Sequence, residues 1–126
     1  MMQILFVAAG GAIGSVGRYV VVGAFERWLG VGFPYGTLAV NVIGSAVLGL
    51  LVGLFITLFD TTPELRLFLV VGILGGFTTF SAFSLDIITL LEKGEAVHAI
   101  LYVALSIVLS AGALYLVLRL VRWIAA

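Results

Sequence analysis

The charged residues of this chain occupy few positions, and the long gaps between them constrain its fold more than any other feature. No Asp, Glu, Lys or Arg occurs between Arg27 and Asp60, between Arg66 and Asp86, or between Glu95 and Arg119. Each gap can hold the roughly 20 apolar residues that an α-helix needs to cross a bilayer. Together with an apolar first segment that carries only Arg18, these gaps predict four membrane-spanning helices, at about residues 3–25, 35–59, 65–91 and 97–123.

The composition agrees with a membrane protein of one domain. The chain has 126 residues, of which 63% are hydrophobic and 10% charged, too few polar groups to cover a soluble domain. We therefore expect residues 1–126 to form a single all-α transmembrane domain in the inner (plasma) membrane. The expected connections are short, and the formal net charge of zero gives no basic surface for nucleic acid. No nucleophile–base pair or metal-ligand cluster suggests an enzyme.

The Lys and Arg residues are almost evenly divided between the two expected sides of the membrane. With four spans, one side has Arg66, Arg119 and Arg122, and the other has Arg27, Lys93 and, if it snorkels, Arg18. Orientation follows the Lys/Arg bias of short loops, and here that bias is nearly absent. Either a weak bias still fixes one orientation, or both orientations insert and an inverted pair assembles. We favour the inverted pair because the Lys and Arg counts are nearly equal. Four short helices are also too few to enclose an aqueous path alone, which favours an oligomer.

The run Gly75–Ser84, with the sequence GGFTTFSAFS, interrupts the third apolar segment. Glycine costs about 1 kcal/mol relative to alanine inside a helix, and Ser and Thr offer the backbone other hydrogen-bond partners. Gly75 and Gly76 also permit unusual backbone angles. Non-helical backbone at membrane depth persists only where protein buries it or where it lines a polar cavity. The run therefore predicts that the third helix is broken within the membrane, at a pathway or an ion site.

Two further helices carry polar stripes at four-residue spacing, which keeps side chains on one face. The stripes are Thr37, Asn41 and Ser45 on the second span, and Tyr102, Ser106 and Ser110 on the fourth. Any one of these groups is explained by hydrogen bonding between helices. Two stripes beside a broken helix favour a lined pathway instead. The stripes supply hydrogen-bond donors rather than the carboxylates expected of a proton carrier or a cation pore, so the pathway suits an anion.

Phe80 and Phe83 lie three residues apart and share a helical face. An aromatic ring has a positive edge, so two ring edges turned toward a pathway would stabilise an anion without a fixed charge. Spacing alone favours an ordinary packing or lipid-facing role for both rings.

Three motifs in order on four short spans make this sequence similar to the Fluc/CrcB fluoride channel family. They are Gly10–Tyr19 (GGAIGSVGRY), Gly36–Asn41 (GTLAVN) followed by Gly44 and Gly49, and the Gly75–Ser84 run. The departures are Ala82 in place of the frequent Thr, Ala46 in place of a bulkier aromatic residue, and Ser15 in place of the usual Ala. Ala82 removes one hydroxyl near the expected break.

The resemblance implies an antiparallel, dual-topology homodimer with two fluoride pores that passively export cytoplasmic fluoride. It implies that Phe80 and Phe83 line each pore and that Asn41 donates to fluoride or holds the rings. The other candidate pore residues are Thr37, Thr79, Ser81, Tyr102, Ser106 and Ser110. The family also binds a central Na⁺ that is not transported, and the matching backbone carbonyls here are those of Gly75 and Thr78.

The sequence allows two interpretations of Arg18 and more than one function. Arg18 either snorkels without a role or concentrates anions at a pore vestibule. The alternative function is a small four-helix, proton-coupled exporter of the multidrug type, but this needs a membrane-buried carboxylate in the first helix, where the chain has Arg18. An accessory membrane subunit without transport would leave the polar stripes unexplained.

Overall fold

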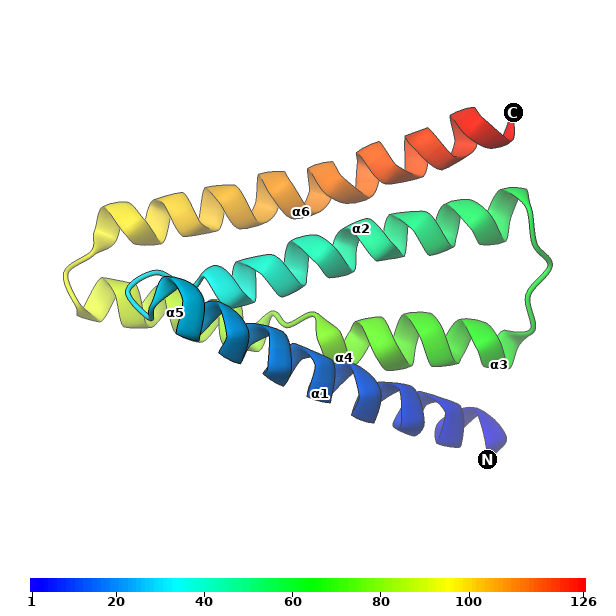
Figure 1. Ribbon diagram of the computed structural model, residues 1–126, viewed down its shortest axis with the longest axis horizontal. Coiled ribbons are helices and arrows are strands. Elements are labelled where there is room, and N and C mark those ends of the chain that lie inside the picture. Colours follow the sequence, from blue (N-terminus) through cyan, green and yellow to red (C-terminus); the bar gives the residue numbers. More distant parts are fainter.

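The computed structural model describes residues 1–126 and consists of long helices that lie side by side (Figure 1). The elements are α1 (Met2–Leu29), α2 (Tyr35–Thr57), α3 (Pro63–Arg66), the π-helix η1 (Leu67–Leu74), α4 (Gly75–Phe77), α5 (Ser81–Glu92) and α6 (Ala96–Ala125). Four helical segments are long and apolar enough to cross a membrane: Met2–Leu29, Tyr35–Thr57, Pro63–Glu92 and Ala96–Ala125. This confirms the prediction of four spans.

The ends of the spans follow local backbone chemistry rather than the positions of charges. Helix α1 continues past the predicted end near residue 25, through Glu26 and Arg27, and ends before Gly30, whose φ of 81° lies in the left-handed region that favours glycine. Gly94, with φ 75°, makes the corresponding turn between α5 and α6. Helix α3 begins at Pro63 after Thr62, whose side chain accepts a hydrogen bond from the Leu65 N–H at 3.2 Å.

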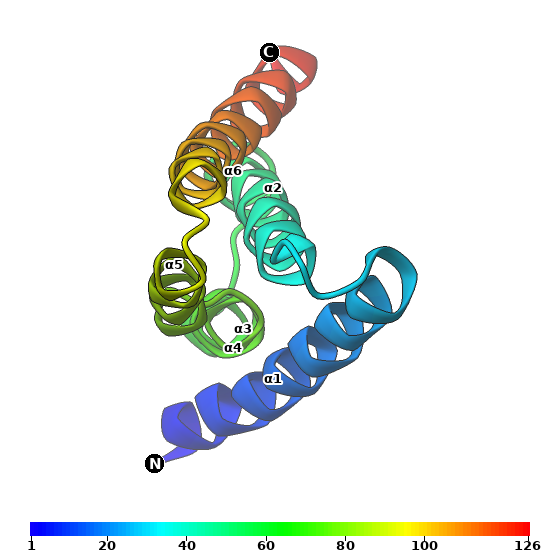
Figure 2. The same ribbon diagram turned by 90° about the vertical axis from the view of Figure 1, so that its left-hand side faces the viewer.

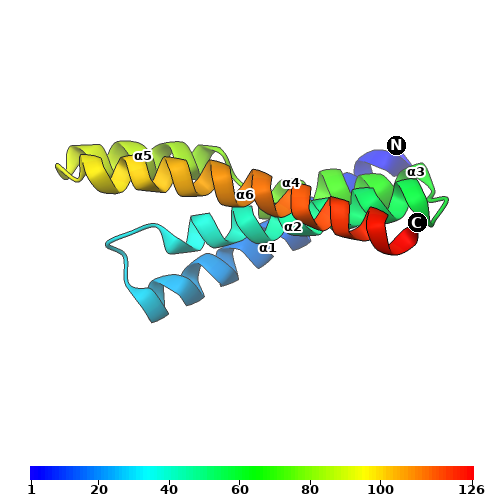
Figure 3. The same ribbon diagram turned by 90° about the horizontal axis from the view of Figure 1, so that it is seen from above.

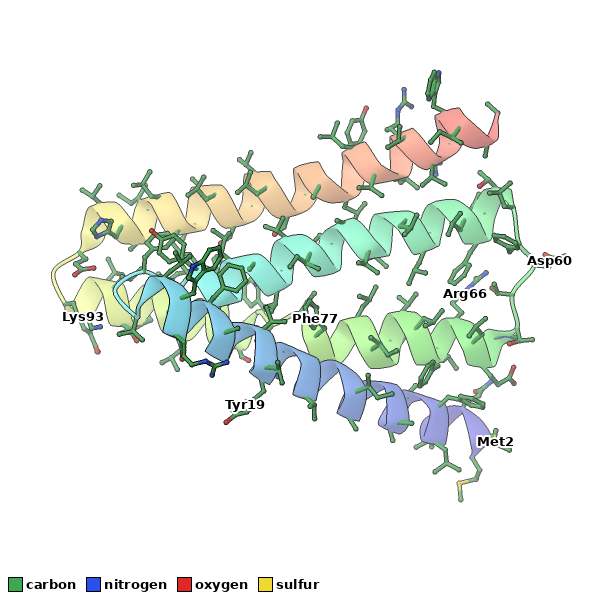
Figure 4. All side chains as sticks on the ribbon, viewed as in Figure 1. Met2, Tyr19, Asp60, Arg66, Phe77 and Lys93 are labelled. Carbon is green, nitrogen blue, oxygen red and sulfur yellow. The ribbon has the colours of Figure 1, made fainter.

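Both chain termini and the connection between α2 and α3 lie at one end of the bundle, and the other two connections lie at the opposite end (Figure 1). Met2, Asp60 and Arg66 mark the first end and Lys93 marks the second (Figure 4). This is the arrangement expected of four antiparallel spans.

Helices α2 and α6 pair along their lengths, whereas α1 crosses the bundle and packs against η1 and α4 (Figures 2 and 3). Glycines allow the close approaches. A β-carbon at Gly49 of α2 would lie 2.6 Å from the Leu114 carbonyl oxygen of α6, and one at Gly72 of η1 would lie 2.8 Å from the Gly10 Cα of α1. Small residues at helix contacts are typical of membrane bundles.

The chain buries few of its residues within itself. Only 15 of 126 residues are buried, and one small core cluster unites Phe83, Leu90, Ala99 and Tyr102 near the α5–α6 turn. Large apolar side chains are exposed along every span. Lipid or further protein must therefore cover most of this surface.

Candidate functional site

The third span is interrupted between α4, which ends at Phe77, and α5, which begins at Ser81. Thr78 makes the turn with extended backbone angles, φ −85° and ψ 157°. Gly75 has the helical angles φ −62° and ψ −36°, so the expectation that the glycines would adopt unusual angles is wrong. The glycines serve close packing instead, because a β-carbon at Gly76 would lie 2.6 Å from the Gly11 carbonyl oxygen of α1.

Asn41 of α2 binds both polar groups of Thr79 at this interruption. Its Nδ2 donates to the Thr79 carbonyl at 3.0 Å, and its Oδ1 accepts from the Thr79 N–H at 2.8 Å. In a continuous helix that N–H would donate to the Gly75 carbonyl four residues earlier. Asn41 therefore fixes the interruption from a neighbouring helix, and these two hydrogen bonds define how its amide is oriented.

The hydroxyl groups of the run satisfy backbone groups at the interruption. Thr78 Oγ1 donates to the Leu74 carbonyl at 2.8 Å. Thr79 Oγ1 accepts from the Ala82 N–H at 3.1 Å, which is the geometry of a side-chain cap at the start of α5. Ser81 Oγ lies 3.4 Å from Thr79 Oγ1. These hydroxyls hold the broken helix in shape before any ligand is considered.

Arg18 of α1 is tied to the same region. Its Nε donates to the Gly76 carbonyl at 3.0 Å, so the side chain points toward α4 and does not snorkel toward the nearer end of α1. A cation at the C-terminal end of a helix is favourable because the carbonyl groups there carry partial negative charge. The snorkelling interpretation of Arg18 is therefore wrong.

A groove of about 640 Å³ opens beside the interruption and is lined by residues of α2, η1, α4, α5 and α6. It brings together Asn41, Thr79, Phe80, Phe83, Ser106 and Ser110 of the predicted pore, together with Gly75 and Thr78 of the predicted cation site. The Oγ atoms of Ser106 and Ser110 are buried and have no hydrogen-bond partner within the chain. The groove thus holds two hydroxyl groups whose hydrogen-bonding capacity the chain itself does not use. No Asp or Glu lines it.

The two phenylalanine rings are in contact but lie in different surroundings. Their centroids are 5.6 Å apart with 54° between the ring planes. Phe83 is 8% exposed and belongs to the core cluster, whereas Phe80 is 78% exposed. The chain itself therefore holds Phe83, while Phe80 projects from its surface.

A second cavity of about 880 Å³ is lined by residues of α1 and α2, including Thr37, together with Thr79. Its charged lining residues are Arg18, Arg27 and Glu26. Thr79 lines both cavities. The residue that Asn41 holds therefore contributes to the walls of both cavities.

Two predicted pore residues line neither cavity. Ser81 is exposed on the surface. Tyr102 is fully buried, and its hydroxyl donates to Asp86 Oδ2 at 2.8 Å. Asp86 was not among the predicted site residues, although a carboxylate inside a long apolar segment is itself a signal of function. The Tyr102 hydroxyl is thus directed to a carboxylate rather than toward the groove.

Comparison with known proteins finds one matching family and many relatives. The sequence model of the family described as "CrcB-like protein, Camphor Resistance (CrcB)" matches residues 5–118. A Fluoride-specific ion channel FluC from Rhizobium johnstonii is 53% identical over 125 residues, which cover 99% of this chain and 100% of the relative. Proteins of the same name from Nitrobacter winogradskyi and Rhodospirillum centenum are 53% and 50% identical, covering 94% and 97% of both chains.

Proposed function

Because this chain belongs to the CrcB-like family, we propose that it is a fluoride-specific channel of the plasma membrane, a transporter and not an enzyme. The observation that carries the proposal is the groove beside the interrupted span. There the unpaired hydroxyls of Ser106 and Ser110 lie with the Phe80 and Phe83 rings, and no carboxylate is among the lining residues.

These groups suit a small, strongly hydrated anion. A selective path must replace the water shell with close donors, yet bind weakly enough to release the ion. Hydroxyl groups and the positive edges of aromatic rings do this without a fixed charge. Asn41 holds Thr79 with one amide hydrogen, which leaves its second amide hydrogen for an anion. Its role thus combines support of the interruption with a contact to fluoride.

Arg18 supplies positive charge at the second cavity, the vestibule of the proposed pore. Only its Nε is bonded to Gly76, so the other guanidinium N–H groups remain available in a cavity that Arg18 lines. Two arginines and one carboxylate, Glu26, line this cavity, so its formal charge is positive, and positive charge at the wall of a cleft raises the local concentration of anions. Arg18 therefore fixes α4 and attracts anions with different atoms of one side chain.

We further infer that two chains assemble as an antiparallel, dual-topology homodimer, with the third helix broken at the membrane midplane and two pores per dimer. The exposed Phe80 ring and the small number of buried residues support a partner chain. So does the charge balance, with three arginines at one end and Arg27 and Lys93 at the other. Reporter fusions at the C-terminus should reveal both orientations. A single orientation would contradict the inverted dimer.

A central Na⁺ at the Gly75 and Thr78 carbonyls is part of the same proposal. The residues fit such an ion, because the Thr79 N–H is bonded to Asn41 and leaves the Gly75 carbonyl without that helical donor. Hard cations take several oxygen ligands, so two inverted chains would together supply four. A β-carbon at Gly75 would meet only the Val70 carbonyl, at 3.8 Å, so Gly75→Ala tests close approach by a partner rather than strain in the turn.

Removal of Na⁺ and its replacement by a large organic cation should abolish fluoride flux if the ion is required. Undiminished flux, with no central ion in a structure of the assembled protein in Na⁺, would remove the site from the account.

Reconstituted vesicles test the function itself. Fluoride efflux should be rapid, chloride efflux should not exceed the leak of protein-free vesicles, and a proton gradient should not be required. Efflux that depends on a proton gradient would favour the four-helix exporter. That alternative has little support here, since α1 carries Arg18 bonded to Gly76 where an exporter needs a carboxylate.

A further inference from the structure

A continuous series of aromatic rings links the connection between α1 and α2 to the groove. The Phe33 ring lies edge-to-face on Tyr102, with centroids 5.6 Å apart and 86° between the planes. Tyr102 contacts Phe83 at 5.1 Å, and Phe83 contacts Phe80 at 5.6 Å. From this series we propose that Phe33 is a positioning residue for the Phe83 ring and acts through Tyr102. The proposal rests on the proposed function, because it assigns the ring a role in the fluoride path.

A tight turn fixes Phe33 before the series begins. The Tyr35 N–H donates to the Phe33 carbonyl at 2.8 Å, and Pro34 between them has φ −79° and ψ 62°. This is an inverse γ-turn, and the proline ring restricts φ to nearly this value. Phe33 is half-buried and packs against the core cluster, whereas Tyr35 is 41% exposed. The turn therefore directs the first ring toward Tyr102 and the second toward the surface.

Tyr102 is suited to transmit the position of Phe33. It is fully buried, and its hydroxyl is held by Asp86 at 2.8 Å. Its ring has Phe33 and Phe83 as aromatic neighbours. Because buried side chains are close-packed, loss of the Phe33 ring leaves space into which the Tyr102 ring can tilt about its fixed hydroxyl. Phe83 then loses the surface that orients its edge at the groove.

Phe33→Leu tests this proposal, with Tyr35→Leu as the matched control. Leucine keeps apolar bulk but has no ring edge, and Tyr35 contacts Phe33 at 4.9 Å without belonging to the core cluster. We expect Phe33→Leu to lower fluoride efflux at least about fivefold, because one favourable aromatic pair is lost. Phe33→Tyr keeps a ring at this position and should conduct like the parent protein. Tyr35→Leu should change the flux less than about twofold. Equal losses in Phe33→Leu and Tyr35→Leu would overturn the proposal.

A double-mutant cycle with Tyr102→Leu separates positioning from general destabilisation. If Phe33 acts through Tyr102, Phe33→Leu should cause no further loss of flux in the Tyr102→Leu background, since residues that act through one contact are not additive. Fully additive losses would contradict the proposal.

A readout independent of conduction comes from 4-fluorophenylalanine placed at position 83. Its ¹⁹F resonance should shift in Phe33→Leu and stay in place in Tyr35→Leu and Phe33→Tyr. If the parent protein conducts no fluoride, the proposed function fails, and these spectra alone decide whether Phe33 positions the ring. An unchanged resonance in Phe33→Leu would overturn the positioning role whether or not the protein conducts.

Discussion

Replacement of Asn41 by alanine should loosen the interruption of the third span more than any other single change in the groove. The substitution removes the hydrogen bonds to the Thr79 carbonyl at 3.0 Å and from the Thr79 N–H at 2.8 Å. Each backbone group that loses its partner away from water costs about 1–3 kcal/mol. Loss of both partners therefore destabilises the interrupted backbone by about 2–6 kcal/mol. Even 2 kcal/mol raises a local opening equilibrium about 30-fold.

Hydrogen exchange of the peptides that span residues 78–84, followed by mass spectrometry, measures this opening. We expect exchange in Asn41→Ala to be faster by about 30-fold or more, and fluoride efflux to fall as the interruption loosens. Ser45→Ala is the control, because Ser45 lines the same groove one turn further along α2. Unchanged exchange in Asn41→Ala, or equal acceleration in Ser45→Ala, would refute the reasoning.

Three further predictions concern packing, charge and the rings. Gly14→Ala should lower the free energy of unfolding by about 1–3 kcal/mol, because its β-carbon would overlap the Ile73 carbonyl oxygen. Gly11→Ala, with nothing within 4 Å, should instead raise the free energy of unfolding by up to about 1 kcal/mol, because alanine is the better helix former, and thermal unfolding in detergent measures both changes. Arg18→Gln should reduce flux most at low ionic strength, and the loss should shrink as salt screens the field. Arg18→Lys keeps the positive charge and should retain the salt-dependent part of the flux. A loss that is independent of salt in both variants would limit Arg18 to packing. Phe83→Ile and Phe80→Ile should both reduce flux. Phe83→Ile should also lower the melting temperature more than Phe80→Ile does, because its own chain buries Phe83 but leaves Phe80 78% exposed. Normal flux in both variants would return the rings to a packing role.

Charge spacing in the sequence was enough to predict the four spans, because a charged side chain inside the bilayer is costly at any rotation of the helix. The Gly75–Ser84 run predicted an interruption in this part of the third span, but the non-helical backbone lies at Thr78 and not at the glycines, which stay helical, and Gly76 packs closely on α1. The π-helix Leu67–Leu74 had no such signal. A segment that is apolar on all sides has no periodicity from which a wider helical turn could be recognised.

The candidate site was predicted as a set of residues but not as a set of contacts. Asn41 was recognised as a donor, yet its partner Thr79 is 38 residues away, and sequence spacing cannot choose among distant acceptors. Tyr102 was placed on one stripe with Ser106 and Ser110 by its spacing, but its long side chain reaches Asp86 instead. Helical periodicity gives the face from which a side chain departs and not the atom it reaches.

The most direct test of the central claim, passive and selective conduction of fluoride, is the reversal potential of the current across a planar bilayer with opposed fluoride and chloride gradients. We predict a reversal potential that shifts by about 59 mV for each tenfold change in the fluoride gradient, as for one elementary charge, and that does not change with chloride or pH. A reversal potential that follows chloride, or a current that appears only with a proton gradient, would contradict it.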